Sequence, residues 1–163
     1  MAKIAIVMGS DSDLPIMGQA QEILTELGVE TFVSVVSAHR TPRRLYEFAE
    51  QAEDNDIAVI IAGAGGAAHL PGMLASITPL PVIGVPVSAT KLEGEDALLS
   101  IVQMPAGVPV ATVAIDGAKN AGILAAQMLG IHDQEIRSRI RTYKQDLEAQ
   151  SLAKAEKVEE LNK

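Results

Sequence analysis

The sequence has no cysteine and very few aromatic residues. Its 163 residues include no Trp, two Tyr and two Phe. Without cysteine, the chain cannot form disulfides, use a catalytic thiolate or build a cysteine-based zinc site. We therefore expect a core of Val, Ile, Leu, Ala and Met. The shortage of large rings also suggests further burial elsewhere, for example between subunits.

An excess of positive charge and long apolar runs are also missing. The formal net charge is −8 and the isoelectric point is about 4.8, which disfavours nucleic acid as a partner. A small phosphorylated ligand remains compatible, because a local site can be positive on an acidic protein. No apolar stretch reaches the roughly 20 residues of a membrane span, so no membrane partner is expected. The strand-like run after Met1 leaves no room for a signal peptide, and we expect a cytoplasmic protein.

Common signatures of metal and cofactor sites are absent. The three histidines, His39, His69 and His132, show no metal-binding spacing. The sequence contains neither a G-x-G-x-x-G dinucleotide motif nor a G-x-S-x-G nucleophile elbow. We therefore expect no metal and no cofactor.

Short apolar runs alternate with segments of helical periodicity, which predicts a parallel sheet covered on both faces. We expect strands at residues 3–8, 31–37, 57–62, 82–87 and 110–115. We expect helices at residues 14–27, 42–53, 71–76, 96–103, 118–129 and 133–150. The predicted fold is α/β, a flavodoxin-like three-layer α/β/α sandwich with a central parallel sheet of about five strands. We interpret residues 1–145 as a single catalytic domain and residues 146–163 as a charged helical extension.

Ligands bind such sheets at the carboxyl ends of the strands, which directs attention to the segments that follow each strand. The first segment is Gly9-Ser10-Asp11-Ser12-Asp13. Its hydroxyl groups and the free N–H groups of the next helix could bind an anion, and Asp13 could accept from ribose hydroxyls. Simple helix capping by Ser and Asp is the alternative.

The second segment is Ser37-Ala38-His39-Arg40-Thr41-Pro42. Histidine titrates near neutral pH and can transfer a proton. Arginine can bind a phosphate or carboxylate through two parallel hydrogen bonds. His39 and Arg40 at a strand's carboxyl end are therefore functional candidates, the alternative being an ordinary surface pair in a turn.

The third segment, residues 63–72, begins with six residues that are all Gly or Ala and continues with His69 and Leu70. Small residues let the backbone approach a ligand closely, as a floor for a flat ring would require. The polar segment at residues 88–96 could be a lid or only a connection. His132 lies between two helices, away from this edge, and we interpret it as structural.

Together, these segments resemble the N5-carboxyaminoimidazole ribonucleotide (N5-CAIR) mutases, the bacterial type of phosphoribosylaminoimidazole carboxylase catalytic subunit. The similarity covers roughly residues 3–130. Besides the three segments above, it includes Gly84-Val85-Pro86-Val87 and Ser100-Ile101-Val102-Gln103-Met104-Pro105. The resemblance implies a homo-octamer with active sites near subunit junctions. Asp116 differs from the Gly that many relatives have at its position.

The resemblance also implies a role for each candidate. His39 would be the general acid–base, Ser10 and Arg40 would lie toward the substrate phosphate, and Asp13 toward the ribose. Ser12 completes the first substrate-binding segment. The residues around the imidazole and its migrating carboxylate would be Ser37, Ala38, Gly65, Ala67, Ala68, His69 and Leu70. Direct AIR carboxylase is the alternative enzyme, although Arg40, where those enzymes typically carry Lys, favours the mutase. A non-catalytic nucleotide-binding module is the alternative outside enzymes.

Overall fold

Five parallel strands form the centre of the molecule in a computed structural model that describes residues 2–162. Their order is β2-β1-β3-β4-β5. The strands are β1 (Lys3–Met8), β2 (Thr31–Val35), β3 (Ile57–Gly65), β4 (Val82–Val87) and β5 (Ala111–Thr112). The prediction of a central parallel sheet of about five strands is thus confirmed. In this order, successive strands are added toward one edge from β1 to β2 and toward the other edge from β3 onward, so the switch point lies between β1 and β3, where ligands bind in such sheets.

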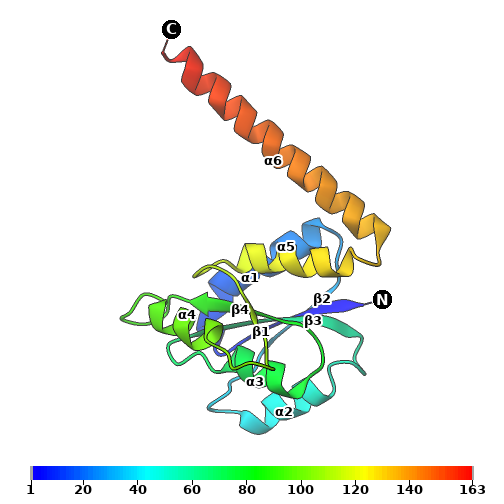
Figure 1. The fold of residues 1–163 in the computed structure, drawn as a ribbon, viewed down its shortest axis with the longest axis vertical. Coiled ribbons are helices and arrows are strands. Elements are labelled where there is room, and N and C mark those ends of the chain that lie inside the picture. The colour runs from blue at the N-terminus through cyan, green and yellow to red at the C-terminus, as the bar shows by residue number, and fades with distance from the viewer. Residues whose placement is uncertain (1, 163) are drawn as a thin grey trace.

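Helices cover both faces of the sheet, as Figure 1 shows. They are the 3₁₀ helix η1 (Asp11–Asp13) and the α-helices α1 (Leu14–Glu26), α2 (Pro42–Glu50), α3 (Leu70–Ile77), α4 (Glu95–Val102), α5 (Ala118–Leu129) and α6 (Gln134–Glu160). Alternate residues of β1 point to opposite faces. Ile4, Ile6 and Met8 join the core beneath α1 and α5, whereas Ala5 and Val7 join the core beneath α2 and α3. This is the predicted three-layer sandwich.

Three strands differ in length from the sequence prediction. β2 ends at Val35 rather than at residue 37. β3 continues to Gly65, because Gly63, Ala64 and Gly65 pair with Val85, Pro86 and Val87 of β4. β5 contains only Ala111 and Thr112 of the predicted 110–115. Beyond them, two isolated hydrogen bonds, from Val113 N to Gly84 O and from Asp116 N to Pro86 O, keep the chain beside β4. The glycine-rich segment is therefore partly a strand, and its turn begins only at residue 66.

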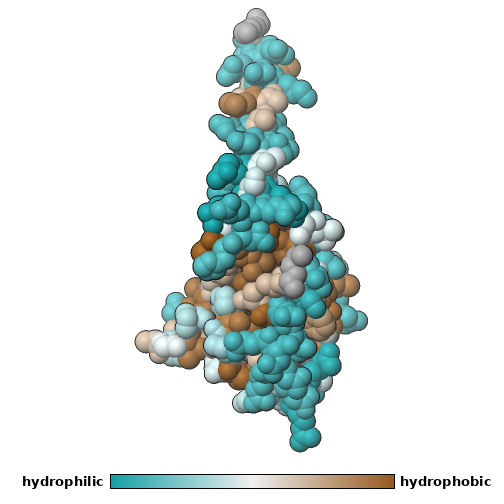
Figure 2. All heavy atoms as spheres, turned by 90° about the vertical axis from the view of Figure 1, so that its right-hand side faces the viewer, coloured by the Kyte–Doolittle hydropathy of each residue, from teal (hydrophilic) through white to brown (hydrophobic). Residues whose placement is uncertain are grey.

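Helix α6 leaves the body of the protein (Figure 1). Its start is anchored by the buried Ile136 and Ile140 and by Arg139, which donates to Leu27 O at the end of α1. Every described residue from 144 to 162 is exposed, including the apolar Leu147, Leu152, Val158 and Leu161. The projecting part is mostly hydrophilic (Figure 2). Within residues 2–162, no helix is long and apolar enough to cross a membrane.

Candidate functional site

Backbone hydrogen bonds bring the first three predicted segments together at the carboxyl ends of β1, β2 and β3. Gly9 N donates to Gly63 O at 3.1 Å, and Val36 N donates to Met8 O at 2.8 Å. Gly63 has no room for a side chain, since a Cβ there would lie 2.2 Å from the Met17 sulfur. The Gly9–Gly63 hydrogen bond, with Met17 of α1 packed over Gly63, thus places the first segment directly beside the glycine-rich one.

His39 and His69 form a contact that joins the second and third segments. The distance between His39 Nε2 and His69 Nδ1 is 2.6 Å, and the two rings are nearly perpendicular, with an interplanar angle of 88°. Two nitrogens this close need one proton between them, so one ring donates and the other accepts. Both side chains are exposed. The pair can therefore exchange a proton with a ligand and pass it between the rings.

Asp13 supplies a buried carboxylate in the first segment, close enough to Arg40 to feel its positive charge. Its side chain is only 4% exposed, and one oxygen accepts from Ser10 N at 3.1 Å. Burial raises the pKa of Asp13 above its ordinary value, and the negative charge of Asp11 acts in the same direction. The hydrogen bond from Ser10 and the positive charge of Arg40 lower the pKa in part. A carboxylate held out of water at the edge of a site is suited to accept hydrogen bonds from a ligand.

Ser10 caps η1, in a capping box with Asp13, and interacts with Ser12 inside that helix. Ser10 Oγ accepts from Ser12 N at 3.3 Å, and the two hydroxyl oxygens are 3.0 Å apart. Ser10 Oγ also donates to Asp11 Oδ1 at 3.2 Å. The capping interpretation is confirmed for Ser10 and Asp13. Capping does not remove the hydroxyl groups from use, because Ser10 and Ser12 remain at the surface.

The second segment is a compact turn built on Ser37. The Ser37 hydroxyl accepts from Arg40 N at 3.2 Å and from Arg40 Nε at 3.4 Å. Thr41 Oγ1 donates to Ser37 O and accepts from Ser37 N. Ser37 and Ala38 are buried, whereas His39 and Arg40 are exposed. The buried pair therefore holds the backbone, while the outer pair presents an imidazole and a guanidinium to a ligand. Thr41, which the sequence did not single out, stabilises this turn through its two hydrogen bonds to the Ser37 backbone.

The third segment divides into exposed and buried positions. Ala67 and His69 are exposed, whereas Ala68 and Leu70 are each 1% exposed and pack in the core beneath α2 and α3. Any contact that Ala68 or Leu70 makes with a ligand therefore involves backbone atoms. Gly66 has a φ of 61°, which favours glycine, and it turns the chain from β3 toward α3.

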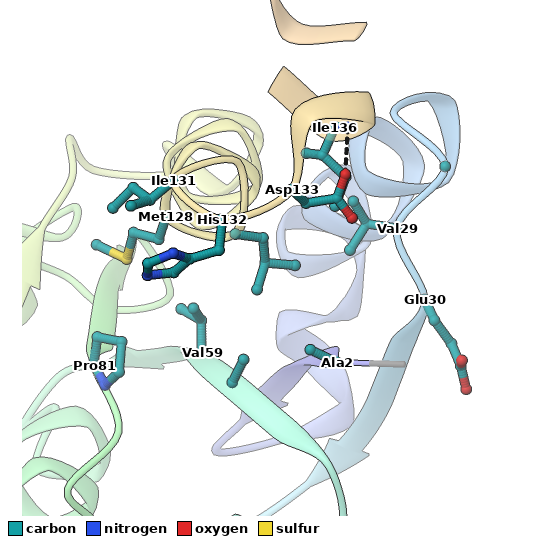
Figure 3. Close-up of a pocket in the computed structure, with 13 residues that line it drawn as sticks. Ala2, Val29, Glu30, Val59, Pro81, Met128, Ile131, His132, Asp133 and Ile136 are labelled. Atoms are coloured by element: carbon teal, nitrogen blue, oxygen red, sulfur yellow. Dashed lines mark hydrogen bonds between the residues drawn. The ribbon is translucent and has the colours of Figure 1, made fainter. Parts of the chain in front are cut away.

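A large hollow lies at the opposite, amino end of the sheet (Figure 3). Its volume is about 680 Å³, and its wall is mostly apolar, with Val59, Met128 and Ile131 among the lining residues. His132 points into this hollow, and Asp133 accepts from the N–H groups of Glu135 and Ile136 as the cap of α6. We call this hollow the amino-end groove. It offers a ligand few polar groups that are not already used.

Metal binding is not indicated by the geometry of the described chain. Across residues 2–162, no three His, Asp or Glu side chains are grouped so that they could hold a metal ion. The chemistry available at the carboxyl end of the sheet is therefore proton transfer by His39 and His69, anion binding by Arg40 and hydrogen bonding by Asp13 and the serines.

Comparison with known proteins shows the family. Residues 3–150 match the family model described as AIR carboxylase, and the chain belongs to that family. It is 60% identical over 161 residues to the N5-carboxyaminoimidazole ribonucleotide mutase of Thermotoga maritima, covering 99% of this chain and 94% of that protein. It is 54% identical to the phosphoribosylaminoimidazole carboxylase of Candida glabrata, covering 97% of this chain but only 28% of that protein. The crystal structure of Treponema denticola PurE superposes with a TM-score of 0.83 at 27% identity, covering 94% of this chain and 96% of that one.

Proposed function

We propose that this protein is an isomerase of de novo purine biosynthesis that interconverts N5-CAIR and 4-carboxy-5-aminoimidazole ribonucleotide. The observation that carries the proposal is the 2.6 Å contact between His39 and His69 at the strand ends. It provides a proton-transfer pair beside an anion-binding arginine. Two near-full-length relatives that are 60% and 58% identical are named N5-carboxyaminoimidazole ribonucleotide mutases, which supports N5-CAIR as the substrate.

Substrate binding follows from the charges of the first two segments. Arg40 and Ser10 bind the phosphate, because the exposed guanidinium and the half-buried hydroxyl follow neighbouring strands at the same edge of the sheet. Asp13 accepts from the ribose hydroxyls, and Ser12 supports the same segment. The imidazole ring lies against Gly65 and Ala67, where small side chains let a flat ring approach the backbone. Ser37, Ala38, Ala68 and Leu70 shape this surface through their backbone positions.

The reaction needs one proton to move and one molecule of CO₂ to be retained. Protonation of the carbamate nitrogen breaks its bond to the carboxyl carbon and releases CO₂ and aminoimidazole ribonucleotide (AIR). The enamine-like ring carbon 4 then attacks the CO₂ carbon, and His39 removes the proton from carbon 4, which restores the aromatic ring. Holding CO₂ beside the ring supplies a high effective concentration. None of these reaction steps needs a metal ion or a redox group, so we propose that the enzyme works without a cofactor.

Direct carboxylation of AIR is the second candidate, because the Candida glabrata relative is named a carboxylase. The decisive assay supplies purified protein with N5-CAIR, or with AIR and bicarbonate, and follows the ultraviolet absorbance of the carboxylated imidazole. A mutase consumes N5-CAIR far faster than it carboxylates AIR at physiological bicarbonate. Preference for AIR and bicarbonate would make the protein a carboxylase. Binding of either ribonucleotide without turnover would make it a nucleotide-binding module.

We further propose a cytoplasmic homo-octamer in which active sites lie near subunit junctions. Exposed apolar side chains support this assembly. Leu14, Val35 and Tyr46 are between 41% and 50% exposed near the site, and Leu147, Leu152, Val158 and Leu161 are exposed on α6. The division into a catalytic domain, residues 1–145, and an extension, residues 146–163, belongs to the same proposal. Light scattering should give eight times the mass of the 17.1 kDa chain, and a monomer mass would refute the assembly.

A further inference from the structure

Asp116 occupies a backbone conformation that normally favours glycine. It lies in the turn between β5 and α5 with a φ of 58°. A residue with a Cβ is strained there relative to glycine, although Asp tolerates the region better than most. Retaining a carboxylate at a position where glycine would relieve the strain points to a use for the side chain.

The Asp116 side chain forms hydrogen bonds with the loop that follows β4. Asp116 Oδ1 accepts from Ser88 N at 2.9 Å, and Oδ2 accepts from Ser88 Oγ at 2.5 Å. The backbone adds a third bond, from Asp116 N to Pro86 O at 2.8 Å. Two turns separated by 28 residues in sequence are therefore joined by a bidentate contact. We call the contact between Asp116 and Ser88 the loop clamp.

The clamped loop lies directly against the glycine-rich segment of the candidate site. A Cβ on Gly65 would lie 2.9 Å from the Ala89 side chain, and one on Gly66 would lie 3.2 Å from the Thr90 methyl group. Only hydrogen fits at Gly65 without displacing the loop. Farther along the loop, Thr90 Oγ1 donates to Asp96 Oδ2 at 2.9 Å. Residues 88–90 therefore back the surface that Gly65 and Gly66 present.

We propose that Asp116 is a positioning residue that acts through Ser88. By holding residues 88–90 in place, it fixes the backbone of Gly65 and Gly66 against which the substrate ring lies. The identity of that substrate rests on the proposed function, whereas the mechanical coupling between the two turns does not. The consequence is that Asp116, without touching the ligand, sets the shape of the substrate-binding surface.

The test compares Asp116→Gly with Asp56→Gly. Asp56 is the matched control because it is also an aspartate at positive φ, 61°, but lies in the exposed turn before β3 at the amino end of the sheet. Both substitutions relieve backbone strain, so both variants should fold. Amide hydrogen exchange at residues 88–90 should be about tenfold faster in Asp116→Gly and unchanged in Asp56→Gly, since only the former loses hydrogen bonds to a charged group.

Steady-state kinetics supply the second measurement. KM for N5-CAIR should rise about tenfold in Asp116→Gly, with kcat changed much less, because the binding surface is loosened while His39 is untouched. Ser88→Ala should raise KM in the same direction, and adding it to Asp116→Gly should have little further effect, since the clamp is already open. Unchanged exchange at residues 88–90, or an equal rise of KM in Asp56→Gly, would overturn the proposal. If the wild-type protein does not turn over N5-CAIR, the proposed function is wrong, and the exchange measurement alone decides the clamp.

Discussion

The two ends of the sheet offer very different surfaces. At the amino end, the groove is large, about 680 Å³, and its wall is mainly apolar. At the carboxyl end, short segments from β1, β2 and β3 bring two imidazoles, a guanidinium and a buried carboxylate into one region. Each end has a histidine and an aspartate. At the groove, Asp133 caps α6, and most of the residues that line the groove with His132 are apolar.

From this difference we expect the chemistry where polar groups converge rather than in the apolar hollow. The apolar groove can exclude water and bind an apolar surface, but it does not combine proton transfer with anion binding, because none of its lining residues besides His132 is a His, Lys or Arg. The strand ends can combine the two, because successive parallel strands deliver their loops to one edge. Variants at matched positions of the two ends can test this comparison directly.

The largest effect is expected at His39, and His132 provides the matched control. His39→Asn should lower kcat by roughly 10²- to 10⁴-fold, the usual contribution of a general acid–base, while ribonucleotide binding is retained. His132→Asn at the amino-end groove should leave kcat within about twofold of the wild type. Stopped-flow or steady-state turnover of N5-CAIR measures both. Near-normal turnover by His39→Asn would remove His39 from its assigned role.

The placement of His39 could be predicted from the sequence, but its partner could not. Short connections tie His39 and Arg40 to the end of β2, so a strand prediction suffices to place them at the edge. The contact with His69 depends on how loops from two strands that are not neighbours face each other across β1. Local sequence carries no signal for that orientation. The loop clamp between Asp116 and Ser88 could not be predicted either, because it also depends on how two loops far apart in sequence face each other.

The lengths of β3 and β5 could not be predicted from local sequence either. The apolar run of β3 predicted its start but not its extension to Gly65, because Gly and Ala have low strand preference and only pairing with β4 keeps them extended. For β5, the apolar residues 110–115 predicted a longer strand than the two residues observed. An edge strand with a single partner can leave the ladder wherever the chain must turn. Pairing across the sheet, rather than propensity, decided both cases.

A smaller effect is expected at Arg40. Arg40→Ala should weaken AIR binding about 10- to 100-fold, because hydrogen bonds to a charged group contribute roughly 1.5–3 kcal/mol. Binding of the dephosphorylated nucleoside should change much less. Arg43→Ala, an exposed arginine two positions into α2, controls for the general loss of positive charge. Calorimetric titration of the wild type, Arg40→Ala and Arg43→Ala with AIR and with the nucleoside measures these affinities. Equal weakening of nucleotide and nucleoside by Arg40→Ala contradicts the phosphate assignment.

Asp13 should show a modest effect on stability with a definite pH dependence. Because burial raises its pKa above 3.8, the folded state disfavours the ionised form, and the protein loses stability as pH rises through the folded pKa. Asp13→Asn escapes this cost, so its Tm should exceed that of the wild type by roughly a few degrees at pH 7, with the gap closing toward about pH 4. Substrate binding should nevertheless weaken.

The matched control for that measurement is Asp133→Asn at the amino-end groove. Asn caps helices about as well as Asp, so the bonds to Glu135 N and Ile136 N can be retained and Tm should stay nearly constant. Thermal melts from pH 4 to 7 compare the two variants. If Asp13→Asn is less stable than the wild type at pH 7, burial is not the dominant cost at Asp13.

The smallest effect is expected at the groove itself. Ile131 is 64% exposed on its rim, so Ile131→Ser should change the free energy of unfolding by no more than about 0.5 kcal/mol and leave kcat/KM for N5-CAIR unchanged. Light scattering of the same variant separates catalysis from assembly. A loss of mass with normal turnover would make the groove a subunit contact. A loss of turnover at unchanged mass would show that the amino end takes part in the reaction, which would break the contrast between the two ends of the sheet.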